Sequence, residues 1–229
     1  MLERTRLGES IIAYQSPLLR GLGVPHAFGT RHGDADQLAG AIGLTQHAWV
    51  TVKQVHGSTV ARGPRDGHPP SCTEADAVML DAPGHATRIV TADCVPIFLV
   101  STDGRRVAAI HAGWRGLVAG VIERAADQLG ARFLAAVGPC ISAAHFEVGP
   151  EVAQHFDPAH HRTPPGHKPH IDLAAAAAAR LKALGAQAID CTDRCTYRDA
   201  KDFYSHRRDV THGGAATTGR LSHLIAPKR

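Results

Sequence analysis

Two histidines and one cysteine stand at the ends of strand-like segments, where their side chains can reach a common cleft. Cys94 lies near the start of one apolar run, His111 ends the next, and His56 follows a third segment with the sequence VTVKQV. Two imidazoles and one thiolate are the ligands of an open catalytic zinc site, whose fourth position is left for water or substrate. The spacing lacks the paired ligands of a zinc finger or zinc protease, so buried structural side chains remain the alternative.

The same residues allow a second kind of chemistry. Cys94 and His111 could form a thiolate–imidazole pair of the kind that acts as a nucleophile in cysteine hydrolases. Asp93, next to Cys94, either orients a reacting group or only caps a turn. Asp76, at the start of the strand-like run 75–80, is likewise either a site residue or only a turn former. Spacing alone does not choose between the metal ligand and the nucleophile.

Several arginines are candidates for binding an anion. Arg115 lies in the segment Gly-Trp-Arg-Gly before an expected helix, where backbone N–H groups favour phosphate. Arg207, Arg208 and Arg220 offer further contacts near the C-terminus, although arginines are also common on protein surfaces. Arg31 follows a turn, where it faces either a ligand or solvent.

Length and composition restrict the class of protein. The 229 residues can bury one sizeable core, so we expect a single domain over residues 1–229. No uncharged run is long enough to span a bilayer. The first residues carry scattered charges and lack the continuous apolar core of a secretion signal, so we expect a cytoplasmic protein. The five cysteines are an odd number, which favours free thiols or ligands over disulfides. The formal charge of +4 is spread along the chain without a basic block, so we expect no nucleic-acid or membrane partner.

The elements that must position these residues are strands and helices in irregular alternation. Hydrophobic patterns and turn residues predict strands at residues 11–15, 50–55, 75–80, 88–92, 96–101, 106–111, 132–137, 188–191 and 221–226. Helices are predicted at 35–49, 117–129, 147–156 and 173–184, and loops at 63–73 and 160–170. Thr102-Asp103-Gly104 predicts a hairpin turn. We therefore expect a mixed α/β or α+β domain rather than a doubly wound sheet.

An ordered set of short motifs resembles a known family. The motifs are KQVHG (53–57), ADAVM (75–79), TADCVPI (91–97), HAGWRG (111–116), VGPCI (137–141), FEVGPEV (146–152), CTY (195–197), FYSHRRD (203–209) and TGR (218–220). Together they resemble the YfiH/YlmD-like family, long labelled multicopper polyphenol oxidase (laccase) and now described as purine nucleoside phosphorylases. The resemblance covers roughly residues 20–225, and TADC followed by HAGWRG is a rare combination.

The resemblance implies a fold, a cofactor and an activity. It implies a compact α/β sandwich distantly like the catalytic domains of cytotoxic necrotizing factors, and one zinc ion bound by His56, Cys94 and His111. It also implies phosphorolysis of adenosine, inosine and methylthioadenosine to the free base and pentose 1-phosphate, with adenosine deamination as a further activity. Cys94, His111 and Asp93 are then the expected catalytic residues. Arg31, Gln54, Arg115, Arg207 and Arg208 are the expected contacts to substrate or phosphate.

The chain departs from the family pattern at a few positions. DQLAGAIGL replaces the usual NLG-type stretch, Cys140 stands where alanine is usual, and His206 stands where tyrosine is usual. A copper oxidase is disfavoured because a trinuclear cluster uses HxH pairs, and the sequence has none. A Cys–His hydrolase and a non-catalytic, cell-wall-linked binding module remain the alternatives.

Overall fold

Strand pairing builds two six-stranded mixed sheets in the computed structural model, which describes residues 1–8, 10–64, 74–130 and 132–229. The first sheet has the strand order β1 (Glu3–Leu7), β2 (Ile11–Gln15), β3 (His26–Gly29), β12 (Leu221–Ile225), β7 (His85–Thr91) and β4 (Ala48–Val50). The second has the order β11 (Ile189–Asp190), β10 (Phe133–Val137), β8 (Val95–Ser101), β9 (Val107–Ala112), β6 (Ala77–Leu80) and β5 (Val60–Arg62). Three pairings are parallel, namely β4 with β7, β5 with β6 and β10 with β11.

The two sheets pack face to face, and the central strands of the second sheet are covered on both sides. Along β8, Phe98 and Val100 join the core between the sheets, whereas Ile97 and Leu99 join the core beneath the helices. Phe98 stacks on Phe28 of the first sheet with ring centroids 4.3 Å apart. Both faces are apolar, and this explains why β8 and β9 read as continuous hydrophobic runs rather than alternating ones.

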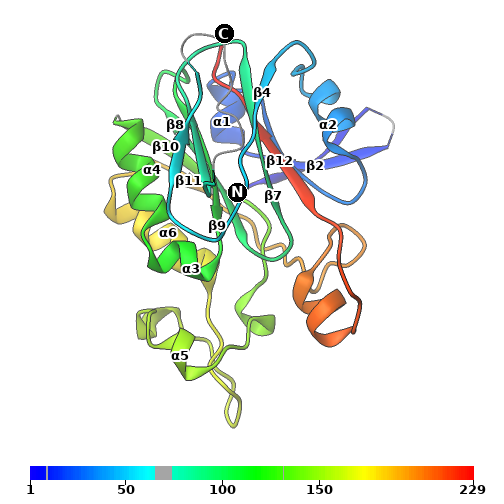
Figure 1. The fold of residues 1–229 in the computed structure, drawn as a ribbon, viewed down its shortest axis with the longest axis vertical. Helices are drawn as coiled ribbons and strands as arrows, with labels where there is room; N and C mark the ends of the chain where they lie inside the picture. The colour runs from blue at the N-terminus through cyan, green and yellow to red at the C-terminus, as the bar shows by residue number, and fades with distance from the viewer. Residues whose placement is uncertain (9, 65–73, 131) are drawn as a thin grey trace.

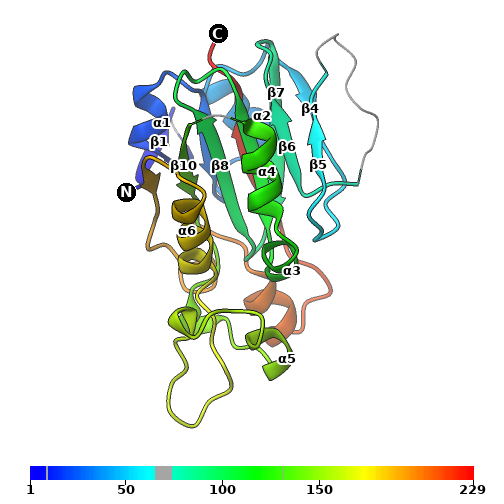
Figure 2. The same cartoon turned by 90° about the vertical axis from the view of Figure 1, so that its left-hand side faces the viewer.

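Helices cover the outer faces of both sheets (Figures 1 and 2). The helices α3 (Trp114–Val118), α4 (Val121–Leu129) and α6 (Leu173–Ala183) contribute to the core on the second sheet, and α2 (Ala35–Ala41) to that on the first. The shorter elements are α1 (Pro17–Gly21), η1 (Ala143–His145), α5 (Pro150–Ala153), η2 (Pro158–His160) and the π-helix η3 (Arg207–His212). Both α5 and η3 lie beyond one end of the sheets (Figure 1). The expected α/β sandwich is confirmed.

Several elements form as the sequence predicts. The strands β8 and β9 make the hairpin around residues 102–104, and β2 has the predicted bounds. Helix α6 begins after Asp172, whose side chain accepts a hydrogen bond from the N–H of Ala175 at 2.9 Å. The terminal strand β12 lies between β3 and β7, so the end of the chain completes the first sheet.

The predicted strand at residues 50–55 is wrong beyond Val50. The sheet strand ends there, and the following residues are held by side chains instead. The amide of Gln54 donates to the carbonyl of Val90 and accepts from its N–H, both at 2.8 Å. A side chain thus replaces the backbone ladder that a strand at this position would have formed.

The predicted helix at 117–129 is two helices. Gly120 has a φ of 82° and separates α3 from α4, because this left-handed conformation cannot continue an α-helix. The end of α4 agrees with the prediction, since Gly130 adopts a φ of 59° and donates to the carbonyl of Ala126. The predicted helices at 35–49 and 147–156 are also shorter, at Ala35–Ala41 and Pro150–Ala153.

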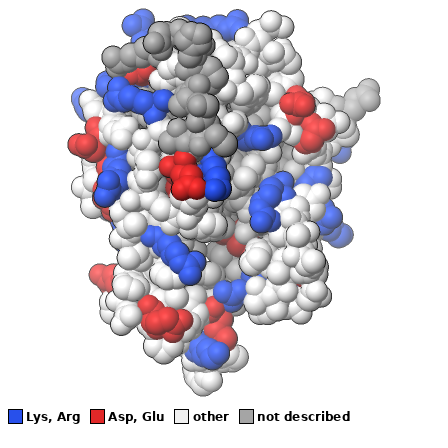
Figure 3. Space-filling model, in the orientation of Figure 1, with Lys and Arg blue, Asp and Glu red and all other residues white. Residues whose placement is uncertain are grey.

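Two further expectations, the loop at residues 63–73 and the absence of a membrane-spanning segment, can be compared only with the described residues. Most of the predicted loop at 63–73 lies outside the described residues, as does Cys72. In the described part of the chain, no helix is long and apolar enough to cross a membrane. Basic and acidic side chains lie interspersed over the face shown in Figure 3.

Candidate metal centre

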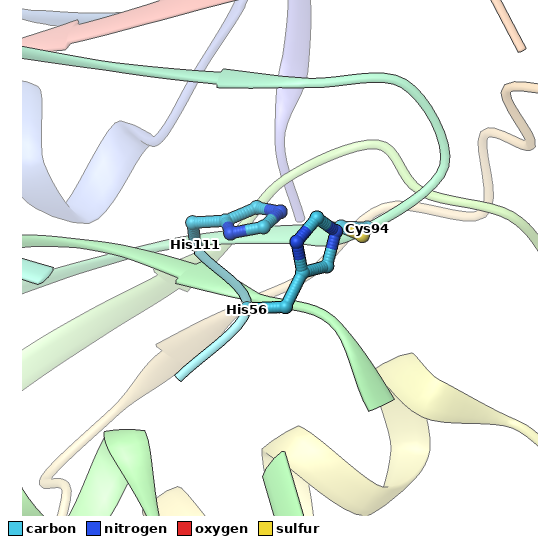
Figure 4. Close-up of side chains that lie close together, drawn as sticks. All are labelled: His56, Cys94 and His111. Carbon is cyan, nitrogen blue, oxygen red and sulfur yellow. The ribbon is translucent and has the colours of Figure 1, made fainter. Parts of the chain in front are cut away.

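Three segments that are distant in sequence bring His56, Cys94 and His111 together. Their ligand atoms all lie within 4.8 Å of one another, and the two imidazole rings meet edge to face with centroids 4.8 Å apart. His56 comes from the loop after β4, Cys94 from the turn between β7 and β8, and His111 from β9 (Figure 4). His56 is exposed and His111 is buried, so the group has one side open to solvent.

Asp76 holds the two histidines in place. Its buried carboxylate accepts hydrogen bonds from the N–H groups of Val55, His56 and Gly57 at 3.2, 2.9 and 2.6 Å. These bonds support the φ of 62° at His56, a conformation that non-glycine residues rarely adopt. The same carboxylate lies 2.7 Å from Nδ1 of His111. Nδ1 is thereby occupied, and Nε2 of His111 is left for the site.

Burial and hydrogen bonds shift the pKa values of this group strongly. Burial alone raises the pKa of the Cys94 thiol, but hydrogen bonds with His111 and His56 outweigh it and lower the pKa to about 7. Burial alone lowers the pKa of His111, but hydrogen bonds with Asp76 and Cys94 outweigh it and raise the pKa to about 9. The pKa of Asp76 is lowered: burial opposes this shift, and the hydrogen bond from His111 and those from the backbone outweigh it. At neutral pH the metal-free pair is therefore an imidazolium facing a cysteine that is partly ionised to the thiolate.

Two glycines of the HAGWRG motif are required by close packing at the site. A Cβ atom on Gly113 would lie 3.1 Å from Sγ of Cys94 and 3.2 Å from Cδ2 of His56. A Cβ atom on Gly116 would lie 2.9 Å from the carbonyl oxygen of Gly57. Side chains at these positions would push apart the segments that carry the ligands.

The ligand group opens into a cavity of about 500 Å³, within the range of about 300–1,000 Å³ usual for small-molecule sites. Besides the three ligands, the residues that matter most in its lining are Gln54, Asp93, Phe146, His206, Arg207 and Arg220. A larger hollow of about 670 Å³ lies elsewhere, near Arg20 and Lys228. We place the site in the smaller cavity because only that cavity, among the described residues, contains a group of ligating side chains.

Asp93 lines the cavity, but its carboxylate is already engaged by neighbouring segments. It accepts hydrogen bonds from the hydroxyls of Thr196 and Ser205, at 2.6 and 3.0 Å, and from the N–H of Arg207 at 2.7 Å. These bonds tie the turn before Cys94 to two C-terminal segments. Gln54 is likewise occupied, by its bonds with Val90.

The predicted arginines divide into two groups. Arg207 lines the cavity, donates one bond to the carbonyl of Glu147 at 2.8 Å and lies over the ring of Phe146. Arg220, another arginine of the C-terminal group, also lines it, and its hydrogen bonds within the described residues go to the carbonyls of Thr218 and Gly219 in its own turn. Among the described residues, neither arginine has a carboxylate within ion-pair distance.

Three other predicted arginines lie outside the lining of this cavity. Arg31 donates to the carbonyl of Ala200 and lies over the ring of Tyr204. Arg115 is exposed and lies over the ring of Trp114. Arg208 donates to the carbonyls of Thr196, Tyr197 and Phe203 and pairs with Asp209, so its guanidinium braces the C-terminal segment.

Sequence reasoning missed some residues of the site. Phe146 and His206 line the cavity but were not assigned to the site, although each falls within one of the family motifs. Asp76 was left open as either a site residue or a turn former, because its only local signal is a lone carboxylate at the start of an apolar strand. That signal is equally typical of a turn.

The donor atoms fit a zinc ion. Cysteine sulfur and imidazole nitrogen are ligands that Zn²⁺ prefers, and three of them leave one position open. In such sites the ring nitrogen of a ligating histidine that does not face the metal usually donates a hydrogen bond to a carboxylate or carbonyl oxygen. Asp76 provides this carboxylate for His111. In the described part of the chain, this set is one of two groups that could hold a metal, and it lacks the histidines of a trinuclear copper cluster.

Zinc binding to the metal-free protein is expected to release protons, and the number released per zinc ion should change near pH 7. The Cys94–His111 pair should release about one proton between the two pKa values of about 7 and about 9, and about two below them. From this pair alone, affinity should fall about tenfold per pH unit between those values and about a hundredfold per unit below. Isothermal titration in buffers of different ionisation enthalpy measures the count. A count that stays constant across this range would contradict the assignment of both ligands.

The fold and the site together define a two-sheet α/β protein in which one cysteine and two histidines that could hold a metal line a common cavity. Residues 32–228 match the family described as multi-copper polyphenol oxidoreductase laccase, and the chain belongs to this family. The resemblance to YfiH/YlmD-like proteins is thereby confirmed.

Relatives in this family carry the name of an enzyme. The chain is 38% identical to purine nucleoside phosphorylase YfiH of Shigella flexneri over 184 residues, which cover 77% of this chain and 72% of that one. It is 34% identical to the purine nucleoside phosphorylase of Deinococcus radiodurans over 255 residues, covering 93% and 94% of the two chains. The crystal structure of YlmD from Geobacillus stearothermophilus has the same fold, with a TM-score of 0.83, 23% identity and 99% of each chain covered. These names support an enzyme.

Proposed function

We propose that the chain is a zinc-dependent purine nucleoside phosphorylase. It converts adenosine, inosine and methylthioadenosine to the free base and pentose 1-phosphate, and it also deaminates adenosine. One observation carries the proposal: His56, Cys94 and His111, braced by Asp76, lie in the same cavity as two arginines that have no described carboxylate partner. The names of the relatives supply the substrate class.

Arg207 and Arg220 are the residues we assign to phosphate. Phosphorolysis needs a cationic group that holds phosphate in line with the ribose carbon it attacks. Arg207 is held in one orientation by Glu147 and Phe146, and its remaining N–H groups are available to phosphate oxygens. This assignment replaces Arg208, whose donors are used within the protein.

The apolar part of the cavity is suited to a purine. Phe146 presents an aromatic ring, and Val52 and Ile141 add aliphatic surface beside the ligand group. Zinc, held by His56, Cys94 and His111, would supply a Lewis acid that lowers the pKa of bound water to about 7. Asp76 would keep His111 oriented with Nε2 towards the site, and Asp93 would hold Arg207 near it through the backbone. We assign this activity to the cytoplasm because the four described cysteines are free.

A Cys–His hydrolase is the second candidate, and one observation favours it. A thiolate with a pKa of about 7 beside an imidazolium is also the resting state of a nucleophilic cysteine. This candidate gives no role to His56, which lies close to both residues. His56 therefore separates the two mechanisms.

The phosphorylase is expected to cleave inosine to hypoxanthine and ribose 1-phosphate only when phosphate is present. Adenosine should also give inosine in phosphate-free buffer. Arg207→Gln and Arg220→Gln should each raise the KM for phosphate roughly tenfold to a hundredfold, since each removes a charge-assisted contact. Arg115→Gln, outside the cavity, is the matched control and should leave this KM unchanged. Chromatography of the products measures the reaction. Equal consumption of inosine with and without phosphate would identify a hydrolase instead.

A further inference from the structure

A second group of ligating side chains lies beyond the end of the sheets, in the segment before α5 and the loop that leads to α6. The ligand atoms of Glu147, His167 and His170 lie within 4.8 Å of one another. This part of the chain projects at the bottom of both ribbon views (Figures 1 and 2). None of the three is a ligand of the first site.

Backbone pairing brings two of these residues together. Glu147 and His170 are partners in an antiparallel bridge, flanked by hydrogen bonds from Val148 to Pro169 at 2.8 Å and from Ile171 to Phe146 at 3.2 Å. Residues directly opposite each other in an antiparallel pair project to the same side. His167 joins them from the preceding turn, with its ring 6.2 Å from that of His170.

His170 has a ring nitrogen that requires a partner. The residue is 6% exposed, and its Nδ1 donates to the carbonyl of Ala143 at 2.6 Å. Nε2 then carries a lone pair, yet it is buried without a hydrogen-bond partner among the described residues. The nearest oxygen of Glu147 lies 3.7 Å from Nε2, which is too far for a hydrogen bond. Two ligands of one tetrahedral zinc ion lie roughly 3.3 Å apart, so a small inward movement would place both on a single ion.

We propose that Glu147, His167 and His170 bind a second zinc ion. Two imidazoles and one carboxylate suit a divalent transition metal, and the carbonyl bond at Nδ1 fixes the tautomer that presents Nε2 to it. The exposed His167 and the partly exposed Glu147 leave access from solvent.

The ion would fasten the 161–170 loop to a wall of the first cavity. Glu147 follows Phe146, which lines that cavity, and its carbonyl accepts the hydrogen bond from Arg207. A metal on the carboxylate of Glu147 would therefore hold the same segment that orients Arg207. Its contribution is to position this wall, and it takes no part in the chemistry at Cys94.

The test removes the first site and measures what metal remains. The double variant His56→Ala/Cys94→Ser is expected to bind about one zinc per chain in equilibrium dialysis. Adding His167→Ala, a change at an exposed residue, should remove this zinc, as should His170→Gln. His160→Ala is the matched control, because it changes a histidine of the same region outside the cluster. Its zinc content should equal that of the double variant.

Cobalt spectra of the unaltered protein give an independent measurement. The second equivalent of Co²⁺ should add ligand-field bands without a thiolate charge-transfer band, and His167→Ala should abolish that second addition. The proposal is overturned if the double variant binds no zinc, or if it binds equal amounts with and without His167. Because neither measurement uses nucleoside turnover, its result is independent of the phosphorylase assignment.

Discussion

The His56→Ala variant is expected to lose zinc and turnover together. Replacing a residue that only hydrogen-bonds a metal ligand typically lowers metal affinity about 10–100-fold. Removing a direct ligand should therefore lower zinc affinity more than a hundredfold. Zinc content of the purified variant and the rate of inosine phosphorolysis are the measurements. His206→Ala is the control for metal content, because His206 lines the same cavity without belonging to the ligand group, and it should keep its zinc.

The same variant distinguishes zinc catalysis from a nucleophilic cysteine. If Cys94 and His111 act as a covalent pair, His56 is dispensable, and His56→Ala should retain most of the activity. A zinc-bound thiolate also reacts slowly with alkylating reagents. Iodoacetamide should therefore modify Cys94 only after zinc has been removed by a chelator. Full phosphorolysis by verified zinc-free protein would exclude the zinc mechanism.

Asp76→Asn is expected to weaken zinc binding about 10–100-fold although Asp76 does not contact the metal. Asparagine keeps the size of the side chain but removes the charge that faces Nδ1 of His111. In the metal-free protein the pKa of His111 should fall below its value of about 9, because the negative charge of Asp76 that raises it is lost while burial still lowers it. A histidine titration by NMR measures this pKa, and competition with a chelator measures the affinity.

Asp93→Asn is the matched control for this prediction. Asp93 is also a buried carboxylate with three hydrogen-bond donors, but none of them belongs to a ligand side chain. Its replacement should lower thermal stability while the pKa of His111 stays near 9. If both variants shift this pKa equally, Asp76 has no specific role in orienting His111.

Local patterns in the sequence were sufficient for many elements of the fold. The hairpin around residues 102–104 and the Asp172 cap of α6 depend on neighbours within a few residues, so turn and helix preferences predict them. The three zinc ligands were also named from residue type and from their positions at strand ends, with support from a family resemblance. Whether those side chains bind metal is still a prediction.

Only the tertiary structure revealed what organises the site. Asp76 meets His111 because β6 pairs with β9, which sets Ala77 opposite Ile110, and strand register is a property of segments far apart in sequence. The same long-range packing separates Arg207, which lines the cavity, from its neighbour Arg208, which braces the C-terminal segment. It also places Glu147 beside His170. Residue type determines which atoms can bind or react, whereas pairing between distant segments decides which of them meet.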